Sequence, residues 1–143
     1  MADRFIRLGT EVAQPGEHMS ISVLIVEDDA SVREMMAEFL NLEGFRPITV
    51  ANGREALKYL KNGGEAGVIL LDLMMPVMTG FDFRREQQRD PALAAIPVIV
   101  LSANAGERAA DMQPAAAFQK PVRLDEVILM VRLLLAEPHV WQS

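Results

Sequence analysis

Short apolar runs of strand length alternate with longer helix-like segments along most of this chain. Five such runs can be read, namely ISVLIV from Ile21, RPITVA from Arg46, VILLD from Val68, IPVIVLS from Ile96 and AAAFQ from Ala115. The strongest of them do not alternate apolar with polar residues, which is typical of strands covered by helices on both faces of a parallel sheet. Strands that alternate with helices connect through right-handed crossovers. We therefore predict an α/β fold: a doubly wound, five-stranded parallel sheet with helices on both faces.

Helix signals fill the gaps between these runs. After the first run, apolar residues recur at helical spacing from Val32 to Leu40, Ser31 and Glu34 fit a capping box, and Gly44 provides a stop. The other helices are expected from a cap at Asn52 and Glu55 to Gly63 and Gly64, over Gly80 to Asp90, in a short alanine-rich stretch before Pro114, and from Leu124 to a stop at Glu137 and Pro138.

The expected helix over Gly80 to Asp90, with the sequence GFDFRREQQRD, has a thin apolar face. Phe81 and Phe83 are followed by mostly polar residues, so the periodicity that identifies the other helices is weak here. Its place between two strand-like runs still favours a helix.

The composition excludes several classes of protein. The chain has 143 residues, half of them hydrophobic, which suits one folded domain. It has no cysteine, so disulfides, thiolate nucleophiles and cysteine-ligated metals are excluded. The first twenty residues lack the apolar core of a signal peptide and no segment is long enough to span a bilayer, so we expect a cytoplasmic protein without membrane contact. A net charge of -6 without a basic stripe argues against direct binding of nucleic acid.

Polar residues follow four of the expected strands. Glu27 and Asp28 follow the first strand, Asp72 ends the third, Ser102 ends the fourth, and Lys120 follows the fifth. In a parallel sheet these carboxyl ends meet at one edge, where three close carboxylates need a cation between them. Oxygen ligands without histidine or cysteine favour Mg²⁺. A carboxylate, a metal, a hydroxyl and an ammonium together suggest phosphoryl transfer onto Asp72.

Four segments in this order, VLIVEDD, LLDLMMPVMTG, VIVLSA and FQKPV, resemble the receiver domain of bacterial two-component response regulators. The resemblance covers roughly residues 20 to 137 and implies the flavodoxin-like strand order 2-1-3-4-5. It implies that Asp72 is the phosphoacceptor, that Glu27 and Asp28 bind Mg²⁺ together with Asp72, and that Met74 lends a backbone carbonyl to the metal. Ser102 and Lys120 would contact the phosphoryl group, and a cis bond is expected between Lys120 and Pro121.

The resemblance also implies partners and a mode of action. The phosphoryl group would come from a sensor histidine kinase or a histidine phosphotransfer protein, and the output would be contact with an unknown downstream protein, with a phosphorylation-dependent homodimer left open. The domain would not be an enzyme beyond catalysing its own phosphoryl transfer and dephosphorylation.

Other interpretations of the same residues exist. Taken alone, Asp72 could cap the following loop, and Asp29 is expected to cap the first helix rather than bind metal. A metal-dependent phosphatase-like enzyme would also use an aspartyl phosphate, but it commonly has a second aspartate where this chain has Met74. A docking module that works without phosphorylation would have no need of Glu27, Asp28, Ser102 and Lys120.

The chain departs from the family pattern at three places. The aromatic residue that often lies three positions before the lysine is Ala117 here, and Phe118 should face the opposite side of the strand, toward the core. The segment between Ser102 and Lys120 is short, which predicts a small fourth helix. The positions that tune the lifetime of the acyl phosphate are Met74 and Asn104, and an apolar Met74 predicts slow self-dephosphorylation.

We expect three parts along the chain: an N-terminal extension over residues 1–19, a receiver domain over residues 20–137, and a C-terminal tail over residues 138–143. The extension is expected to be flexible, and Met19 would be a natural start for the domain.

Overall fold

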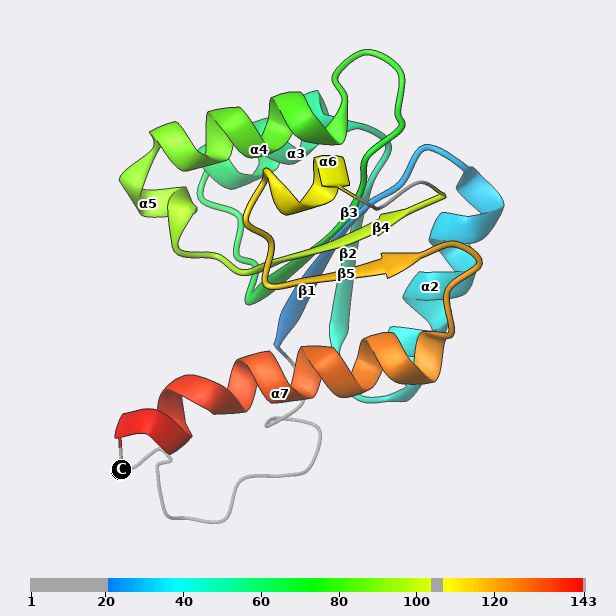
Figure 1. The fold of residues 1–143 in the computed structure, drawn as a ribbon. Coiled ribbons are helices and arrows are strands. Elements are labelled where there is room, and N and C mark those ends of the chain that lie inside the picture. The colour runs from blue at the N-terminus through cyan, green and yellow to red at the C-terminus, as the bar shows by residue number, and fades with distance from the viewer. Residues whose placement is uncertain (1–20, 104–106, 143) are drawn as a thin grey trace.

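Five parallel strands form a single sheet in the order β2-β1-β3-β4-β5. The computed structural model describes residues 21–103 and 107–142 (Figure 1). The strands are β1 (Ser22–Val26), β2 (Arg46–Val50), β3 (Val68–Asp72), β4 (Val98–Ser102) and β5 (Ala116–Gln119). Both the α/β class and the strand order expected from the sequence are confirmed.

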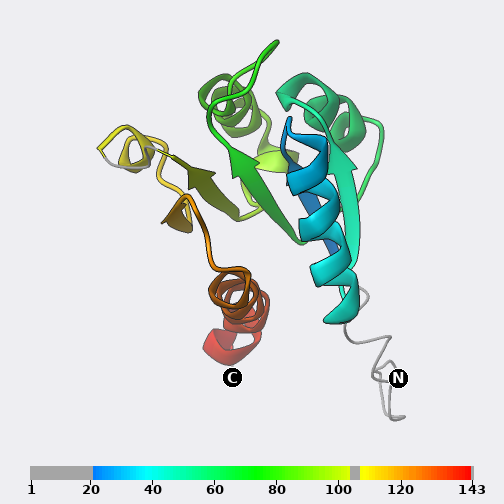
Figure 2. The same cartoon turned by 90° about the vertical axis from the view of Figure 1, so that its right-hand side faces the viewer.

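Helices cover both faces of this sheet. The helices are α2 (Ala30–Leu42), α3 (Gly53–Lys61), α4 (Gly80–Arg89), α5 (Pro91–Ala94), α6 (Glu107–Ala110) and α7 (Leu124–Gln142). In both ribbon views α3 and α4 lie together on one side of the sheet and α7 lies on the other (Figures 1 and 2). None of the helices among the described residues is long and apolar enough to cross a membrane.

Two apolar clusters hold the layers together. The first packs α3, α4 and α5 on one face of the sheet through residues such as Leu57, Phe83 and Leu93. The second packs α2 and α7 on the other face through residues such as Met36 and Val131. Because the apolar strands contribute to both clusters, the central strands are buried on both sides, as their sequences predicted.

The helix caps agree only in part with the sequence patterns. Asp29 caps α2, since its carboxylate accepts hydrogen bonds from the backbone N–H groups of Ser31 and Val32. The expected cap at Asp29 is therefore confirmed, and the capping box of Ser31 and Glu34 is wrong, because the hydroxyl of Ser31 donates to Asp29 instead. Asn52 caps α3 by accepting from the N–H of Glu55, as predicted.

The last helix runs farther than predicted. It continues through Pro138 to Gln142, so the expected stop at Glu137 and Pro138 is wrong. A proline removes one N–H donor and crowds the preceding turn, but the remaining amides can still continue the helix. The predicted extension over residues 1–19 lies outside the described residues.

The segment between Ser102 and Lys120, which was expected to be short, contains α6 and β5. Helix α6 has four residues, so the connection between β4 and β5 contains only a small helix, as predicted. Phe118 packs against the cluster formed with α2 and α7, whereas Ala117 is exposed. Phe118 is partly buried and faces the core, as predicted from the alternation of side chains along the strand.

Gly80 is required by the close approach of α4 to the end of β3. A Cβ atom at Gly80 would lie 2.6 Å from the backbone oxygen of Asp72 and 2.8 Å from the Cα of Leu73. The N–H of Gly80 also donates to the carbonyl of Leu73 at 3.0 Å. The turn that carries Asp72 is thus closed by backbone contact between these residues.

We expect Gly80→Ala to destabilise the protein by about 2 kcal/mol, because the added methyl group must displace backbone atoms. Urea denaturation would measure the change. Gly53→Ala is the matched control, since its Cβ would meet Met78 side-chain atoms at 3.0 and 3.1 Å, which can move aside, as well as the Cβ of Phe83 at 3.0 Å. Equal losses for the two variants would contradict the proposed backbone clash.

Candidate functional site

Three carboxylates gather at the carboxyl ends of β1 and β3. Oxygen atoms of Glu27, Asp28 and Asp72 all lie within 4.8 Å of one another. Glu27 and Asp72 are almost fully buried, whereas Asp28 is exposed. The carboxylates that the sequence placed at one edge of the sheet are therefore brought together, with one side of the cluster open to solvent.

Lys120 reaches into this cluster from the end of β5. Its Nζ lies 3.1 Å from Oε1 of Glu27 and 3.4 Å from Oδ2 of Asp72. Its backbone N–H donates to the carbonyl of Ser102 at 2.8 Å, which places Ser102 beside it at the end of β4. The bond between Lys120 and Pro121 is cis, as expected. Ser102 is buried, and it lies at the same edge of the sheet as Lys120 and the three carboxylates.

Burial shapes the ionisation of this cluster. Burial raises the pKa of Asp72, against the opposing charge of Lys120, and the charge of Asp28 adds to the rise. Burial also raises the pKa of Glu27, although a hydrogen bond from the N–H of Asp29 opposes it. Burial alone would lower the pKa of Lys120, but its contacts with Glu27 and Asp72 outweigh this and raise it. The cluster therefore binds protons or cations more readily than isolated carboxylates would.

These pKa shifts predict a pH dependence of stability in the absence of metal. Because the pKa of Asp72 is raised in the folded state, the folded protein binds more protons than the unfolded chain above about pH 4. The free energy of unfolding should then fall as pH rises through the raised pKa. We expect Asp72→Asn to remove this loss, so its stability advantage over wild type should grow between about pH 4 and neutrality. Urea denaturation with a chelator at several pH values would measure the free energy of unfolding of both proteins. A difference between them that does not change with pH would contradict the prediction.

The donor set suits a hard divalent cation. Three carboxylates on adjacent strand ends supply oxygen ligands only, and two of them carry an unfavourable buried charge that a cation would relieve. The N–H of Met74 donates to Oδ1 of Asp72 at 3.2 Å, which orients that carboxylate. The side chain of Met74 is 64% exposed and points away from the core.

One residue that the sequence did not single out supports the acidic pair. Nη1 of Arg33, in the first turns of α2, donates to the carbonyl of Glu27 at 2.7 Å and to that of Asp28 at 3.4 Å. Arg33 thus fixes the backbone that presents both carboxylates. The sequence did not indicate this role for Arg33, because an arginine on the polar face of a helix that only contacts solvent would have the same sequence pattern. Asn104 lies outside the described residues.

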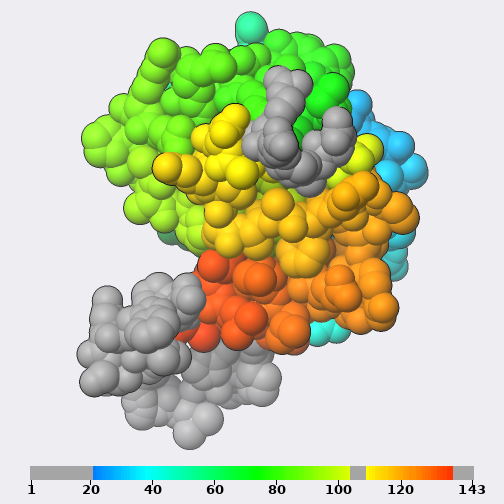
Figure 3. Space-filling model, in the orientation of Figure 1, coloured from blue at the N-terminus to red at the C-terminus, as the bar shows by residue number. Residues whose placement is uncertain are grey.

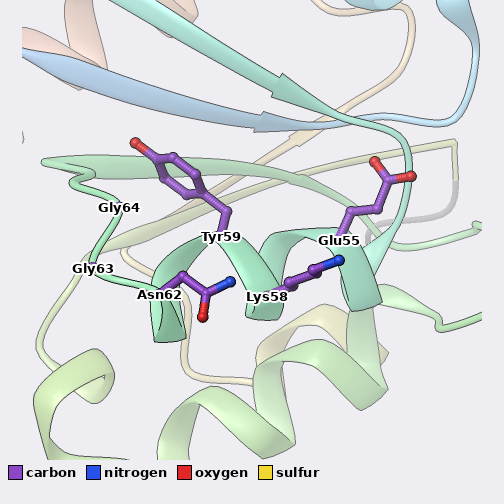
Figure 4. Close-up of a pocket in the computed structure, with 6 residues that line it drawn as sticks. All are labelled: Glu55, Lys58, Tyr59, Asn62, Gly63 and Gly64. Atoms are coloured by element: carbon purple, nitrogen blue, oxygen red, sulfur yellow. The ribbon is translucent and has the colours of Figure 1, made fainter.

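Several hollows lie on the described surface. A largely apolar one of about 420 Å³ adjoins the site, where Lys120 and Pro121 meet Met35 and Met36 of α2. Another of about 460 Å³ lies along α3, where Tyr59 stands beside Gly64 (Figure 4). The second is shallow and has none of the clustered carboxylates, so the chemistry belongs to the edge of the sheet.

Comparison with known proteins gives a consistent result. The family model of the response regulator receiver domain matches residues 23–132. The alkaline phosphatase synthesis transcriptional regulatory protein SphR of Synechococcus elongatus is 34% identical over 136 residues, which cover 87% of this chain and 52% of SphR. Response regulator Rre1 of Synechocystis is 36% identical over 121 residues, which cover 81% of this chain and 52% of Rre1. The chain spans about half the length of these curated relatives.

Solved structures resemble the fold as well. The signal receiver domain of a signal transduction histidine kinase from Syntrophus aciditrophicus has a TM-score of 0.74 and 29% identity, covering 81% of this chain and 90% of that one. Response regulator TrrA from Thermotoga maritima, solved in complex with Mg²⁺ and BeF, has a TM-score of 0.72 and 28% identity, covering 80% of this chain and 99% of that one.

Proposed function

This chain belongs to the response regulator receiver family, and from that membership we propose that Asp72 accepts a phosphoryl group from a phosphohistidine on a partner protein. The observation that carries the proposal is the juxtaposition of buried Asp72 with two further carboxylates and the ammonium of Lys120. The partner would be a sensor histidine kinase or a histidine phosphotransfer protein, and the signal would pass by protein contact in the cytoplasm.

The reaction transfers one phosphoryl group, and no atom is oxidised or reduced. A carboxylate oxygen of Asp72 attacks the phosphorus, a P–O bond forms, and the P–N bond to the donor imidazole breaks with its electron pair returning to nitrogen. Lys120 lies within reach of Asp72 and supplies positive charge where phosphoryl oxygens would lie. Ser102 would donate its hydroxyl to one of those oxygens.

Glu27, Asp28 and Asp72 would hold Mg²⁺, with the backbone carbonyl of Met74 as a further ligand. Bound Mg²⁺ would neutralise charge on the transferring group, as divalent ions do in phosphoryl transfer. The hydrogen bond from the N–H of Met74 keeps one oxygen of Asp72 oriented, while Arg33 keeps the acidic pair in place.

A phosphatase-like enzyme is less well supported by the same site. Turnover by such enzymes needs an acid–base group beside the nucleophile, and the residue two positions after Asp72 is Met74, whose side chain cannot exchange protons. We therefore propose a domain whose chemistry is limited to its own modification.

The proposal is tested by incubating the purified protein with a small acyl phosphate donor and Mg²⁺ and measuring its intact mass. We expect a gain of one phosphoryl group, lost on treatment with hydroxylamine, which cleaves acyl phosphates, and prevented by a chelator. A mass gain that survives hydroxylamine, or no gain in a sample that still binds Mg²⁺, would refute the proposal.

Met74 is expected to prolong the phosphorylated state. An apolar, solvent-exposed side chain at this position cannot orient an attacking water by hydrogen bonding. We expect Met74→Asn to speed loss of the phosphoryl group about tenfold, because an amide can hold that water. The decay of phosphorylated protein after donor removal would measure the rate. Val77→Asn adds an amide to the same exposed loop and is the control. Fast decay of wild type, unaltered by Met74→Asn, would contradict the idea.

A further inference from the structure

The inward face of α4 carries two buried polar side chains. Gln87 is fully buried and Arg84 is 9% exposed, and the same helix buries Phe83. This explains the thin apolar pattern of the segment, because part of the face that contacts the domain is polar. A buried guanidinium is costly unless its N–H groups are satisfied, so its partners indicate what it is there to hold.

Arg84 donates to three neutral oxygen atoms. Nε donates to the carbonyl of Met112 at 3.0 Å, Nη2 to the carbonyl of Gln113 at 3.0 Å, and Nη1 to Oε1 of Gln87 at 2.8 Å. The ion pairs between described residues do not include Arg84. Its planar fork thus serves to hold backbone carbonyls rather than to pair with an acid.

Gln87 fixes Arg84 in this orientation. Its Nε2 donates to the carbonyls of Leu93 and Ile96, at 2.8 and 3.0 Å, which lie in and just after α5. Because both N–H groups of the Gln87 amide point to these carbonyls, the amide oxygen Oε1 points the other way, toward Arg84. The network therefore runs from the entry of β4, through α4, to the residues that precede β5.

The two carbonyls held by Arg84 belong to the turn between α6 and β5. The N–H groups of Met112 and Gln113 donate to Ala109 and Ala110 at the end of α6, and Gln113 has a positive φ of 52°. In the space-filling view α6 and this turn lie against α4 (Figure 3). Helix α6 has only four residues, and Ala109 within it and Met112 just after it are buried in the core cluster. The hydrogen bonds from Arg84 add a polar tether to this small apolar contact.

We propose that Arg84, oriented by Gln87, is a positioning residue that clamps the turn between α6 and β5 onto α4. A change that begins at Ser102 on phosphorylation can then displace α6, while the clamp keeps β5, the strand that leads to Lys120, in register. The second half of this proposal rests on the proposed function, whereas the clamp itself does not.

Hydrogen exchange measured by mass spectrometry tests both halves. We expect Arg84→Met to speed exchange of the amides of Met112 and Gln113 about tenfold in the absence of any phosphodonor, because their turn loses its tether. Arg84→Lys keeps the charge but offers one nitrogen for three acceptors, so it should give an intermediate effect and protects the test if Arg84→Met fails to fold. Arg85→Met is the matched control, since Arg85 lies on the same helix, is exposed and pairs with Asp82.

The same proteins are then compared after adding beryllofluoride and Mg²⁺, an analogue of the phosphorylated state. In wild type we expect exchange to change in α6 and not in β5, and in Arg84→Met the change should spread into β5, which a merely structural role would not produce. Wild-type exchange of Met112 and Gln113 in Arg84→Met, or equal changes in α6 and β5 of wild type, would overturn the proposal. A loosened turn in Arg84→Met without any response to beryllofluoride would support the clamp and refute the proposed function.

Discussion

Replacing Asp72 with asparagine is expected to abolish phosphoryl uptake from both a small donor and a phosphohistidine partner. The amide has nearly the shape of the carboxylate but lacks a nucleophilic oxygen, so no acyl phosphate can form. The fold should persist, because the substitution removes a buried charge whose burial is unfavourable. We expect a loss of at least about a hundredfold in the phosphorylated fraction, measured by intact mass.

The matched control for this variant is Asp82→Asn. Asp82 lies in the first turn of α4 and contacts Arg85 at the surface, so its loss changes the charge by the same amount outside the site. Phosphoryl uptake by Asp82→Asn should equal that of wild type. Equal labelling of Asp72→Asn and wild type would show that another residue accepts the phosphoryl group.

Mg²⁺ is expected to stabilise the folded protein strongly. The carboxylates of Glu27, Asp28 and Asp72 lie within 4.8 Å of one another, and a bound divalent ion would relieve both their repulsion and the cost of their burial. Binding at about a hundredfold excess over Kd contributes ~2.7 kcal/mol, which raises the Tm of a domain of this size by roughly 10 °C. Thermal unfolding with increasing Mg²⁺ would measure the shift.

Asp28→Asn should remove most of this response to Mg²⁺ and raise the Tm of the metal-free protein slightly, because it takes away one repelling charge. Asp29→Asn is the control: it removes the adjacent charge, and asparagine caps a helix as well as aspartate does. The control should keep the full response. If Asp28→Asn and Asp29→Asn respond alike to Mg²⁺, the three carboxylates do not form the metal site.

The sheet and its polar edge were predictable because they depend on strong local patterns. Apolar runs such as VILLD set the strands, and the alternation with helices set their direction, so the residues after each strand had to meet. The capping of α3 by Asn52 followed from the same kind of short-range chemistry.

The features that were missed depend on contacts between distant segments. Arg84 and Gln87 look like surface residues in the sequence, because nothing local shows that Met112 and Leu93 present carbonyls to them. Arg33 was missed for the same reason. Where two local signals compete, as with Asp29 and Ser31 at the start of α2, only the three-dimensional placement of the carboxylate decides.

The strand order has a consequence for how copies of this domain can associate. β2 and β5 are the outer strands, and their free edges are where another chain could add a strand and begin to aggregate. β2 contains Pro47, which lacks an N–H to donate, and β5 has only four residues. Neither edge is therefore a good template for strand addition, which disfavours edge-to-edge aggregation through the described sheet.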